Sequence, residues 1–372
     1  MKILASGSFP NGFSFLIFAE TSLMNRFYTL TLSEVTKETP NAVCLSFDIP
    51  NELRDTFQFT AGQYLTIRHL TAEGTELRRA YSICSTPKSG QLRVGVKKVT
   101  DGAFSIFANT KLKAGDTLEV MPPEGTFTFE DPHATKNIAA FAAGSGITPI
   151  LSIITAALEG SEAPHVLLVY GNQTFQETMF LDDLNALKER FPKRFHVHYV
   201  LSRMQDDDAL FGRIDRSRVN YFLKNKYEDI EFDTYYICGP EPMIDEVSST
   251  LKEHGVNEKF IRFELFTTSE EGALTETHEG YTQVTVTLDD DTETFQMAQD
   301  NSVLQAALDA GMDPPYSCQG GICSTCIARI TEGKVEMRKN QILTDDELAE
   351  GYILTCQSHP TTPTITIDYD DI

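Results

Sequence analysis

The amino-acid sequence predicts a multidomain β and α/β protein: an antiparallel β-barrel, a doubly wound domain with a parallel sheet, and a small C-terminal domain of the β-grasp type. Three observations support this prediction. Short segments with alternating or β-branched residues fill residues 26–129. Strand-like and helix-like segments alternate after Pro132, and a hairpin, a helix and four cysteines follow near the C-terminus. A chain of 372 residues has room for two or three domains.

The barrel is predicted over residues 24–131. Regular short strands between glycine and proline turns favour an antiparallel barrel, and one helix near residues 104–112 interrupts them. Residues 1–23 contain a short apolar stretch without a clear signal-peptide cleavage site, and we expect a non-structural extension there. The predicted strands are residues 28–35, 42–49, 64–69, 92–99 and 117–121.

The doubly wound domain is predicted over residues 132–266. An apolar strand at 138–143 leads into a glycine-rich turn and a helix with one apolar face, formed by Ile150, Ile153, Ile154 and Leu158. Alternating strands and helices are typical of a parallel sheet covered on both faces. Further strands are predicted at 166–170, 195–201 and 235–238, and further helices at 177–191 and after Pro240.

The C-terminal domain is predicted over residues 282–372. The polar, acidic residues 267–281 before it predict an interdomain linker. A small α+β arrangement of this kind suits a β-grasp fold. Its expected elements are a hairpin at 282–288 and 292–297, a helix at 302–310 and a final strand at 364–368.

Four cysteines in this domain have the spacing of metal ligands. Cys318, Cys323 and Cys326 form the pattern C-x4-C-x2-C, and 29 residues separate Cys326 from Cys356. This is the ligand spacing of a plant-type [2Fe–2S] cluster. Two glycines in the loop let the backbone approach the sulfurs of such a cluster. Structural zinc usually takes two separated cysteine pairs, and disulfides are rare without a secretory context, so both remain as weaker alternatives.

The charge of the chain restricts its partners. The net charge is −23, which argues against nucleic acid and anionic membranes. Residues 282–372 hold 16 acidic and four basic residues. This acidic surface either steers docking to a basic partner or only aids solubility. Because no run of 18 apolar residues exists, we expect no transmembrane helix, and a cytoplasmic location follows by default.

The tetrapeptide Arg79-Ala80-Tyr81-Ser82 ends a predicted barrel strand and resembles the R-x-Y-S signature of the ferredoxin–NADP⁺ reductase superfamily. The resemblance implies that Arg79 pairs with a phosphate of FAD, that Tyr81 stacks on the isoalloxazine, and that the Ser82 hydroxyl bonds near flavin N5. Gly102 and Ser105 fit the downstream G-x-x-S that contacts the flavin pyrophosphate at a helix N-terminus.

Two further motifs resemble the nicotinamide-nucleotide site of the same superfamily. The G-x-G-x-[TS]-P turn, which would hold the pyrophosphate, comprises Gly144, Gly146, Thr148 and Pro149. The C-G-P-x-x-M motif at the end of a later strand comprises Cys238, Gly239 and Pro240, and the resemblance places the cysteine beside the nicotinamide. The alternative is that Cys238 is a small buried core residue.

The choice between the two nicotinamide cofactors depends on another strand end. Ser202 and Arg203 follow the strand at 195–201, and an arginine there could hold a 2′-phosphate, so we favour NADPH with NADH as the alternative. Gln173 stands where an arginine would have strengthened this assignment. Near residue 264 the chain resembles the E-x-F segment that places Glu264 and Phe266 near the flavin; the alternative is an ordinary edge strand.

The order of the three domains resembles that of oxygenase reductases. Five sequence runs resemble the reductase subunits of phenylacetyl-CoA epoxygenases: residues 79–84, 120–123, 142–149, 350–354 and 356–357. Phthalate-dioxygenase-type reductases share this order but carry FMN. The resemblance implies electron transfer from NAD(P)H through FAD and a [2Fe–2S] cluster to an oxygenase that docks near the cluster, with Ser82, Cys238 and Glu264 at the hydride-transfer site. A reductase for a desaturase or another monooxygenase, a free-standing diaphorase and, less favoured, a redox sensor remain alternatives.

Overall fold

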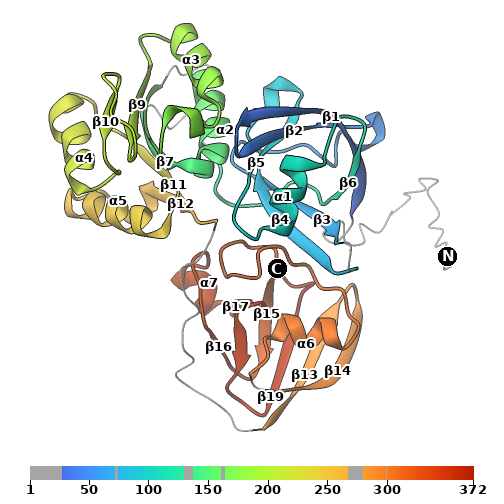
Figure 1. The fold of residues 1–372 in the computed structure, drawn as a ribbon. Coiled ribbons are helices and arrows are strands. Elements are labelled where there is room, and N and C mark those ends of the chain that lie inside the picture. Colours follow the sequence, from blue (N-terminus) through green and yellow to red (C-terminus); the bar gives the residue numbers. More distant parts are fainter. Residues whose placement is uncertain (1–26, 72–73, 130–136, 161–163, 267–279, 299) are drawn as a thin grey trace, which may run out of the picture.

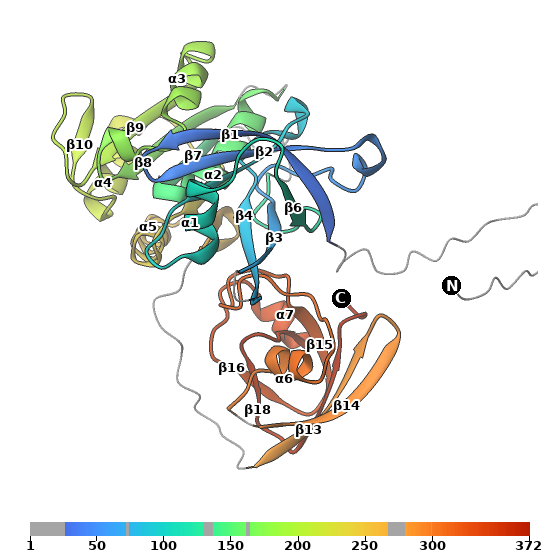
Figure 2. The same ribbon diagram turned by 45° about the vertical axis from the view of Figure 1, so that its right-hand side comes forward.

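The computed structural model describes residues 27–71, 74–129, 137–160, 164–266, 280–298 and 300–372, which form three domains (Figure 1). The N-terminal and central domains lie side by side, and the C-terminal domain lies beneath the N-terminal domain in both views (Figures 1 and 2). The predicted extension at residues 1–23 and most of the predicted linker at 267–281 lie outside the described residues. None of the described helices is long and apolar enough to cross a membrane.

The N-terminal domain is one six-stranded antiparallel sheet in the order β4-β3-β6-β1-β2-β5. Its edges meet where Ile83, just after β4, bridges Val94 of β5, and no continuous ladder closes the predicted barrel in this part of the described chain. Leu30 and Leu32 of β1 point into a core whose inner residues are fully buried. The elements are β1 (Tyr28–Thr39), β2 (Ala42–Asp48), β3 (Tyr64–Leu70), β4 (Glu76–Ser82), β5 (Leu92–Lys97), α1 (Ala103–Thr110) and β6 (Thr117–Val120).

The central domain has a six-stranded parallel sheet in the order β10-β9-β8-β7-β11-β12, which confirms the doubly wound prediction. Its chain order reverses between β7 and β11, so a topological switch point lies at the carboxyl ends of these strands. The elements are β7 (Asn137–Ala143), α2 (Ile147–Leu158), β8 (His165–Asn172), α3 (Leu181–Arg190), β9 (Phe195–Leu201), β10 (Ala209–Phe211), α4 (Arg216–Asn220), β11 (Thr234–Cys238), α5 (Glu241–Glu253) and β12 (Ile261–Glu264).

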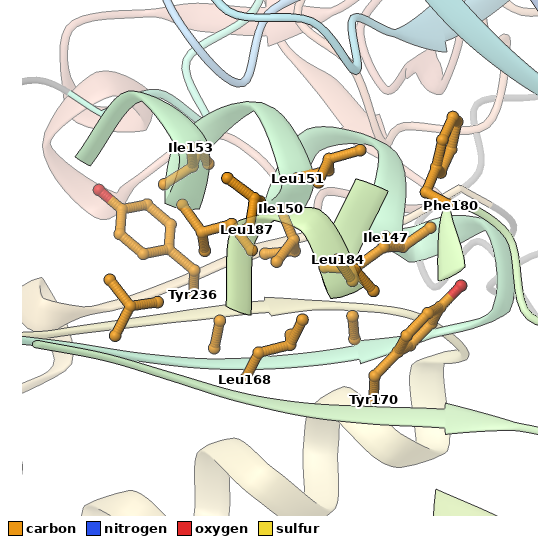
Figure 3. Packing of buried hydrophobic residues seen from close by; sticks show 14 of the residues in the cluster. Ile147, Ile150, Leu151, Ile153, Leu168, Tyr170, Phe180, Leu184, Leu187 and Tyr236 are labelled. Carbon is orange, nitrogen blue, oxygen red and sulfur yellow. The ribbon is translucent and has the colours of Figure 1, made fainter. Parts of the chain in front are cut away.

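Both faces of the central sheet are covered. Side chains that alternate along β7 belong to two different clusters: Ala140 packs with α2 and α3, and Phe141 packs with α5. Figure 3 shows Ile150 of α2 and Leu184 of α3 above Leu168 of β8. The predicted apolar face of α2 is therefore the face that covers the sheet.

One predicted helix start is wrong. The helix predicted from residue 177 begins at Leu181, because Phe175–Glu177 forms a separate short helix, η4. Phe180 then has a positive φ of 57°, which an α-helix of L-residues cannot include. Further short helices are η1 (Asn51–Leu53), η2 (Pro87–Ser89), η3 (Gly144–Gly146), the π-type η5 (Tyr221–Lys226) and η6 (Glu258–Phe260).

The C-terminal domain has a five-stranded sheet in the order β14-β13-β19-β15-β17 and a separate pair of strands, β16 and β18. The predicted hairpin, helix and final strand are confirmed, and the last strand pairs parallel to β13. Ile365 and Ile367 pack against Val284 and Val286 in its core. The elements are β13 (Tyr281–Leu288), β14 (Asp291–Ala298), α6 (Val303–Asp309), β15 (Ile327–Glu332), β16 (Val335–Met337), α7 (Asp345–Ala349), β17 (Tyr352–Leu354), β18 (Ser358–Pro360) and β19 (Thr364–Asp368).

The N-terminal and central domains share a tightly packed interface at β5. A Cβ atom at Gly95 would lie 2.7 Å from Thr148 and 3.0 Å from both Met179 and Phe180, so only glycine fits between the strand and the central domain. The buried Ser152 of α2 donates its hydroxyl to a carbonyl of the N-terminal domain at 2.6 Å. These contacts hold the N-terminal domain and α2 of the central domain together.

Candidate functional site

The flavin residues expected from the sequence lie at the end of β4. Arg79 and Tyr81 share one face of this strand, and Arg79 is exposed, with its guanidinium donating to the Arg78 carbonyl at 2.7 Å. The Tyr81 ring is half-buried, 5.4 Å from the ring of Phe104 in α1. An exposed guanidinium next to an apolar ring on one strand face suits a phosphate and a stacked flavin ring.

Gly102 and Ser105 lie at the start of α1, as predicted. The buried Ser105 hydroxyl donates to the Gly102 carbonyl at 3.1 Å and accepts from the Val99 N–H at 3.2 Å. The serine side chain is thus engaged in shaping the loop. The N–H groups of the first turn of α1 have no partner within the helix, and these are the donors that can face an anion.

The glycine-rich turn lies at the switch point between β7 and β11. Gly144 has a φ of +56°, which favours glycine, and a Cβ at Gly146 would lie 2.1 Å from the Cys238 carbonyl oxygen. A Cβ at Gly239 would lie 2.6 Å from Met243. The three glycines therefore let η3, β11 and α5 approach closely at the sheet edge where such folds bind nucleotides.

The other residues predicted at this sheet edge stabilise the turn and the two helix starts. The Thr148 hydroxyl donates to the Ser145 carbonyl at 3.0 Å, so it closes the turn. Pro149 lies in the first turn of α2 and Pro240 caps the start of α5, positions where a missing N–H breaks no helical hydrogen bond. Sequence reasoning missed Lys97, whose ammonium group lies 3.5 Å from the position that a Gly144 Cβ would take. In the sequence, only the position of Lys97 at the end of β5 could have indicated a positive charge at this turn.

Ser82, Cys238 and Glu264 come from three different strands and meet at one point. Cys238 and Glu264 are register partners in the parallel pair of β11 and β12, and the Ser82 hydroxyl donates to the Glu264 carboxyl at 3.0 Å. Cys238 is fully buried and Glu264 is 8% exposed. Phe266, two residues further on, is half-buried against the central core. The three residues predicted for the hydride-transfer site thus form one buried cluster between two domains.

The ionisation of this cluster follows from its burial. Burial raises the pKa of Glu264 to about 8, and the hydrogen bond from Ser82 offsets part of this rise. Burial also raises the pKa of the Cys238 thiol, with a smaller contribution from the Glu264 carboxylate. At neutral pH Cys238 is therefore a neutral thiol rather than a nucleophilic thiolate.

Ser202 and Arg203 lie away from this cluster, at the carboxyl end of β9. The Ser202 hydroxyl donates to the Asn172 carbonyl at 3.3 Å, and the Arg203 N–H donates to the Gln173 carbonyl at 2.9 Å. Arg203 is exposed. Its guanidinium is therefore accessible to a phosphate at the same sheet edge as the glycine-rich turn.

The four cysteines converge between the loop that leads into β15 and the end of β17. The Cys323 and Cys318 sulfurs lie 3.0 Å apart, and the Gly320 N–H donates to the Cys318 sulfur at 3.3 Å. Hydrogen bonds from Cys323 and then Cys356, with N–H groups of the loop, lower the pKa of Cys318. A loop that stabilises a thiolate in this way fits a metal cluster.

The other two cysteines of the pattern lie in an apolar environment. Among the described residues, no group of three His, Cys, Asp or Glu side chains that could hold one metal ion is found. Cys326 and Cys356 are buried, and both lie in the apolar cluster around Leu354.

Replacing Arg79 by alanine is expected to weaken flavin binding about tenfold to a hundredfold, because one charge-assisted hydrogen bond to phosphate contributes roughly 1.5–3 kcal/mol. The dissociation constant of the flavin, measured by fluorescence quenching, checks this. Arg54→Ala, at another exposed arginine of the same domain, is the control and should bind flavin like the wild type. Equal affinities of all three proteins would contradict the assignment of Arg79.

Three family descriptions match this chain in order. An oxidoreductase FAD-binding domain matches residues 29–129, an oxidoreductase NAD-binding domain matches residues 141–249, and a 2Fe-2S iron-sulfur cluster binding domain matches residues 286–361. These matches confirm the predicted FAD, nicotinamide-nucleotide and [2Fe–2S] sites at the level of domains.

Similar proteins of the same domain composition support the same conclusion. The chain is 39% identical over 354 residues to a subunit of 1,2-phenylacetyl-CoA epoxidase from Escherichia coli, covering 93% of this chain and 99% of that protein. It is 32% identical to the ferredoxin reductase component of 3-ketosteroid-9-alpha-monooxygenase from Rhodococcus rhodochrous, covering 93% and 97%. Phthalate dioxygenase reductase shares the fold, with a TM-score of 0.58 at 23% identity, over 92% of this chain and 98% of that one. From the domain matches and the two relatives at 39% and 32% identity, the chain therefore belongs to the family of FAD- and [2Fe–2S]-containing oxidoreductases that serve as reductase components of oxygenase systems.

Proposed function

We propose that this reductase takes hydride from NADPH and supplies single electrons to an oxygenase of the phenylacetyl-CoA epoxidase type. The observation that carries the proposal is the arrangement of three sites in series. The switch-point turn, the cluster of Ser82, Cys238 and Glu264, and the cysteine loop follow one another across the domain interfaces. Bound FAD accepts electrons in pairs and releases them singly, and the [2Fe–2S] cluster carries one at a time.

Each set of side chains has a distinct task in this proposal. Arg79 and Tyr81 orient the flavin on β4. Glu264 and Ser82 exclude water and hold a proton beside the point where hydride arrives, and Cys238 places a small uncharged thiol next to them at the end of β11. Because Arg79, Ser82 and Cys238 are all present, a redox sensor that has lost hydride transfer is the weaker alternative.

NADPH is proposed as the donor because Arg203 is exposed at the carboxyl end of β9, beside the half-buried Ser202. We expect kcat/KM for flavin reduction to be higher with NADPH than with NADH. Arg203→Ala should lower it for NADPH by about tenfold to a hundredfold and leave it nearly unchanged for NADH, since only NADPH carries the 2′-phosphate. Stopped-flow reduction of the holoprotein by each nucleotide measures both values.

The control for this measurement is Arg213→Ala, which removes another exposed arginine of the central domain. It should alter neither value. If kcat/KM of the wild-type protein is equal for the two nucleotides or higher for NADH, the proposed donor is contradicted and NADH is the substrate.

The acceptor is proposed from the most similar of the named relatives and from charge. The 39% identity with a subunit of phenylacetyl-CoA epoxidase extends over nearly the whole of both chains. The acidic composition of residues 282–372 favours a partner with a basic docking surface. We place the reaction in the cytoplasm, where NADPH is available and cysteine ligands stay reduced.

A reconstituted assay tests the acceptor. The holoprotein is mixed with the oxygenase subunits of a phenylacetyl-CoA epoxidase, and epoxide formation is measured with and without NADPH. Product formation that requires both the reductase and NADPH supports the proposal. Rapid nucleotide oxidation with artificial acceptors but no product with these subunits would instead indicate a diaphorase or a reductase for another oxygenase or desaturase.

A further inference from the structure

The cysteine loop touches the N-terminal domain through one buried hydroxyl. Thr325 lies between two of the predicted cluster ligands, and its Oγ1 is 2.7 Å from Tyr64 Oη and 3.1 Å from a Glu124 carboxyl oxygen. Thr325 is 7% exposed and Tyr64 is 4% exposed. This contact between residues 261 positions apart in the chain is therefore closed to solvent.

The two partners of Thr325 form a rigid seat. Tyr64 begins β3, and its backbone N–H and carbonyl pair with the carbonyl and N–H of Glu124 at 2.8 and 3.0 Å. A Cβ at Gly125 would lie 2.9 Å from the Tyr64 ring, so the turn after Glu124 also packs on the tyrosine. The backbone pairing therefore fixes the relative positions of the two residues whose side chains hold Thr325.

Proton counting assigns the direction of these bonds. When Glu124 is ionised, the Thr325 hydroxyl donates its one proton to this carboxylate, and Tyr64 donates its own proton to Thr325. The same hydroxyl lies 3.6 Å from the Cys323 sulfur. A cysteine that ligates iron has no proton, so in the loaded protein this sulfur can only accept, and it competes with the Glu124 carboxylate for the single Thr325 proton. Thr325 thus stands between the N-terminal domain and a ligand of the cluster.

The seat adjoins the flavin residues. Tyr64 is the register partner of Ser82 in the antiparallel pair of β3 and β4, and Tyr81 precedes Ser82. Both views show β3 and β4 extending toward the C-terminal domain (Figure 2). The two strands that carry the predicted flavin contacts therefore also hold the loop that carries the cluster ligands.

A second interdomain contact lies outside the loop from Cys318 to Cys326. The buried Arg78 pairs with Asp313 at 2.6 Å and lies 4.1 Å above the Tyr316 ring. Asp313 is 63% exposed, whereas the Arg78 side chain is 2% exposed, so this pair also joins the two domains. The hydroxyl contact of Thr325 is the one that lies between two of the predicted cluster ligands.

We propose that Thr325 is a positioning residue for electron transfer from flavin to cluster, seated by Tyr64 and Glu124 of the N-terminal domain. The seat fixes the distance and orientation between the cysteine loop and β4, and it places one hydrogen-bond donor beside Cys323. The step moves one electron from the reduced flavin to the oxidised cluster and neither makes nor breaks a bond. This inference rests on the electron path proposed above.

Single-turnover stopped-flow on the full-length holoprotein tests it, with flavin reduction and cluster reduction followed separately. Thr325→Val and Tyr64→Phe should each slow cluster reduction by roughly tenfold to a hundredfold, because a small misplacement of reacting groups has this effect. Flavin reduction should be unchanged. The double variant should be no slower than the slower single one, because both remove one contact. Thr325→Ser keeps the hydroxyl and should restore the rate.

Ser324→Ala is the matched control. It removes a hydroxyl from the neighbouring residue of the same loop, and among the described residues that hydroxyl forms no side-chain hydrogen bond. Its rate and its cluster should match the wild type. Equal slowing in Ser324→Ala and Thr325→Val would overturn the proposal, since it would indicate a general disturbance of the loop.

The reduction potential of the cluster provides a readout besides the rate. Thr325→Val should shift it to a lower value, because a ligand sulfur that loses a hydrogen-bond donor stabilises the reduced cluster less. Thr325→Val with wild-type rate and potential would overturn the proposal, and so would Tyr64→Phe with a wild-type rate. Tyr64→Phe leaves the loop untouched, so it remains decisive if Thr325→Val loses its cluster. A wild-type protein whose flavin is reduced while its cluster stays oxidised would overturn the electron path itself.

Discussion

Replacing Cys356 by alanine is expected to abolish assembly of the [2Fe–2S] cluster and, with it, electron delivery to one-electron acceptor proteins, while NAD(P)H still reduces the flavin. Three of the predicted ligands share one loop, and Cys356, which follows β17, is the fourth. A cluster of this type needs all four thiolates. The broad visible absorption of the cluster and its iron and sulfide content measure the first effect, and stopped-flow measures the second.

The fold of the Cys356 variant should survive, so the loss can be assigned to the metal site. Both neighbours of Cys356 bind the cysteine loop without metal. Thr355 donates its N–H and hydroxyl to the Cys326 carbonyl at 3.1 and 2.9 Å, and Gln357 donates to the Gln319 carbonyl at 3.0 Å. The loop and the end of β17 therefore stay in register.

The matched control for this variant is Cys44→Ala, which removes a buried thiol from β2 of the N-terminal domain. It should keep the full iron content and normal cluster reduction. A Cys356→Ala protein with wild-type iron, sulfide and cluster absorption would refute the ligand assignment, and one zinc per chain in the wild type would do the same.

The sequence was sufficient for features that are local along the chain. The cysteine spacing, the glycine-rich turn before α2 and the alternation in β1 each depend on neighbouring residues, and each predicted element is present. The strand β4 was predicted only through the tetrapeptide at its end. It carries Glu76, Arg78 and Arg79, so it lacks the alternation of a half-buried strand. Arg78 is buried there because Glu76 and the distant Asp313 compensate its charge.

Two other features were not predicted from the sequence, for two different reasons. The helix α7 had a sequence signal that was not used: Thr344 and Glu347 form a capping box. The seat of Thr325 had no such signal, since Tyr64 and Glu124 become its partners only after two domains pack together. The cluster of Ser82, Cys238 and Glu264 was predicted only because each residue belongs to a motif of its own. Contacts between domains that follow no motif cannot be inferred from the spacing of residues.

Replacing Glu264 by glutamine is expected to remove a large pH dependence of stability. The carboxyl has a pKa of about 8 in the folded protein against an ordinary value of 4.5. Because the folded pKa is the higher one, its contribution to stability is fully present below about pH 4.5 and is lost as the pH rises through about 8. A shift of this size corresponds to up to roughly 5 kcal/mol across that window.

Chemical denaturation of the holoprotein at several pH values measures this effect. The free energy of unfolding of the wild type relative to Glu264→Gln should fall steadily between those two pH values and level off above them. Glu34→Gln, at an exposed position of β1, is the control and should follow the wild type. A difference between wild type and Glu264→Gln that does not change with pH would show that the buried carboxyl is already ionised at neutral pH.

The same ionisation should appear in the kinetics of flavin reduction. Above pH 8 a negative charge develops in a buried site between β4 and β12, beside the point where we propose that the anionic nucleotide delivers hydride. Charge repulsion in such a site is strong because little water screens it. The wild-type rate should therefore fall with an apparent pKa near 8, and Glu264→Gln, which keeps an acceptor for the Ser82 hydroxyl, should lose this fall. A wild-type rate that rises through this pH range would assign Glu264 the opposite role, that of a base needed in its charged form.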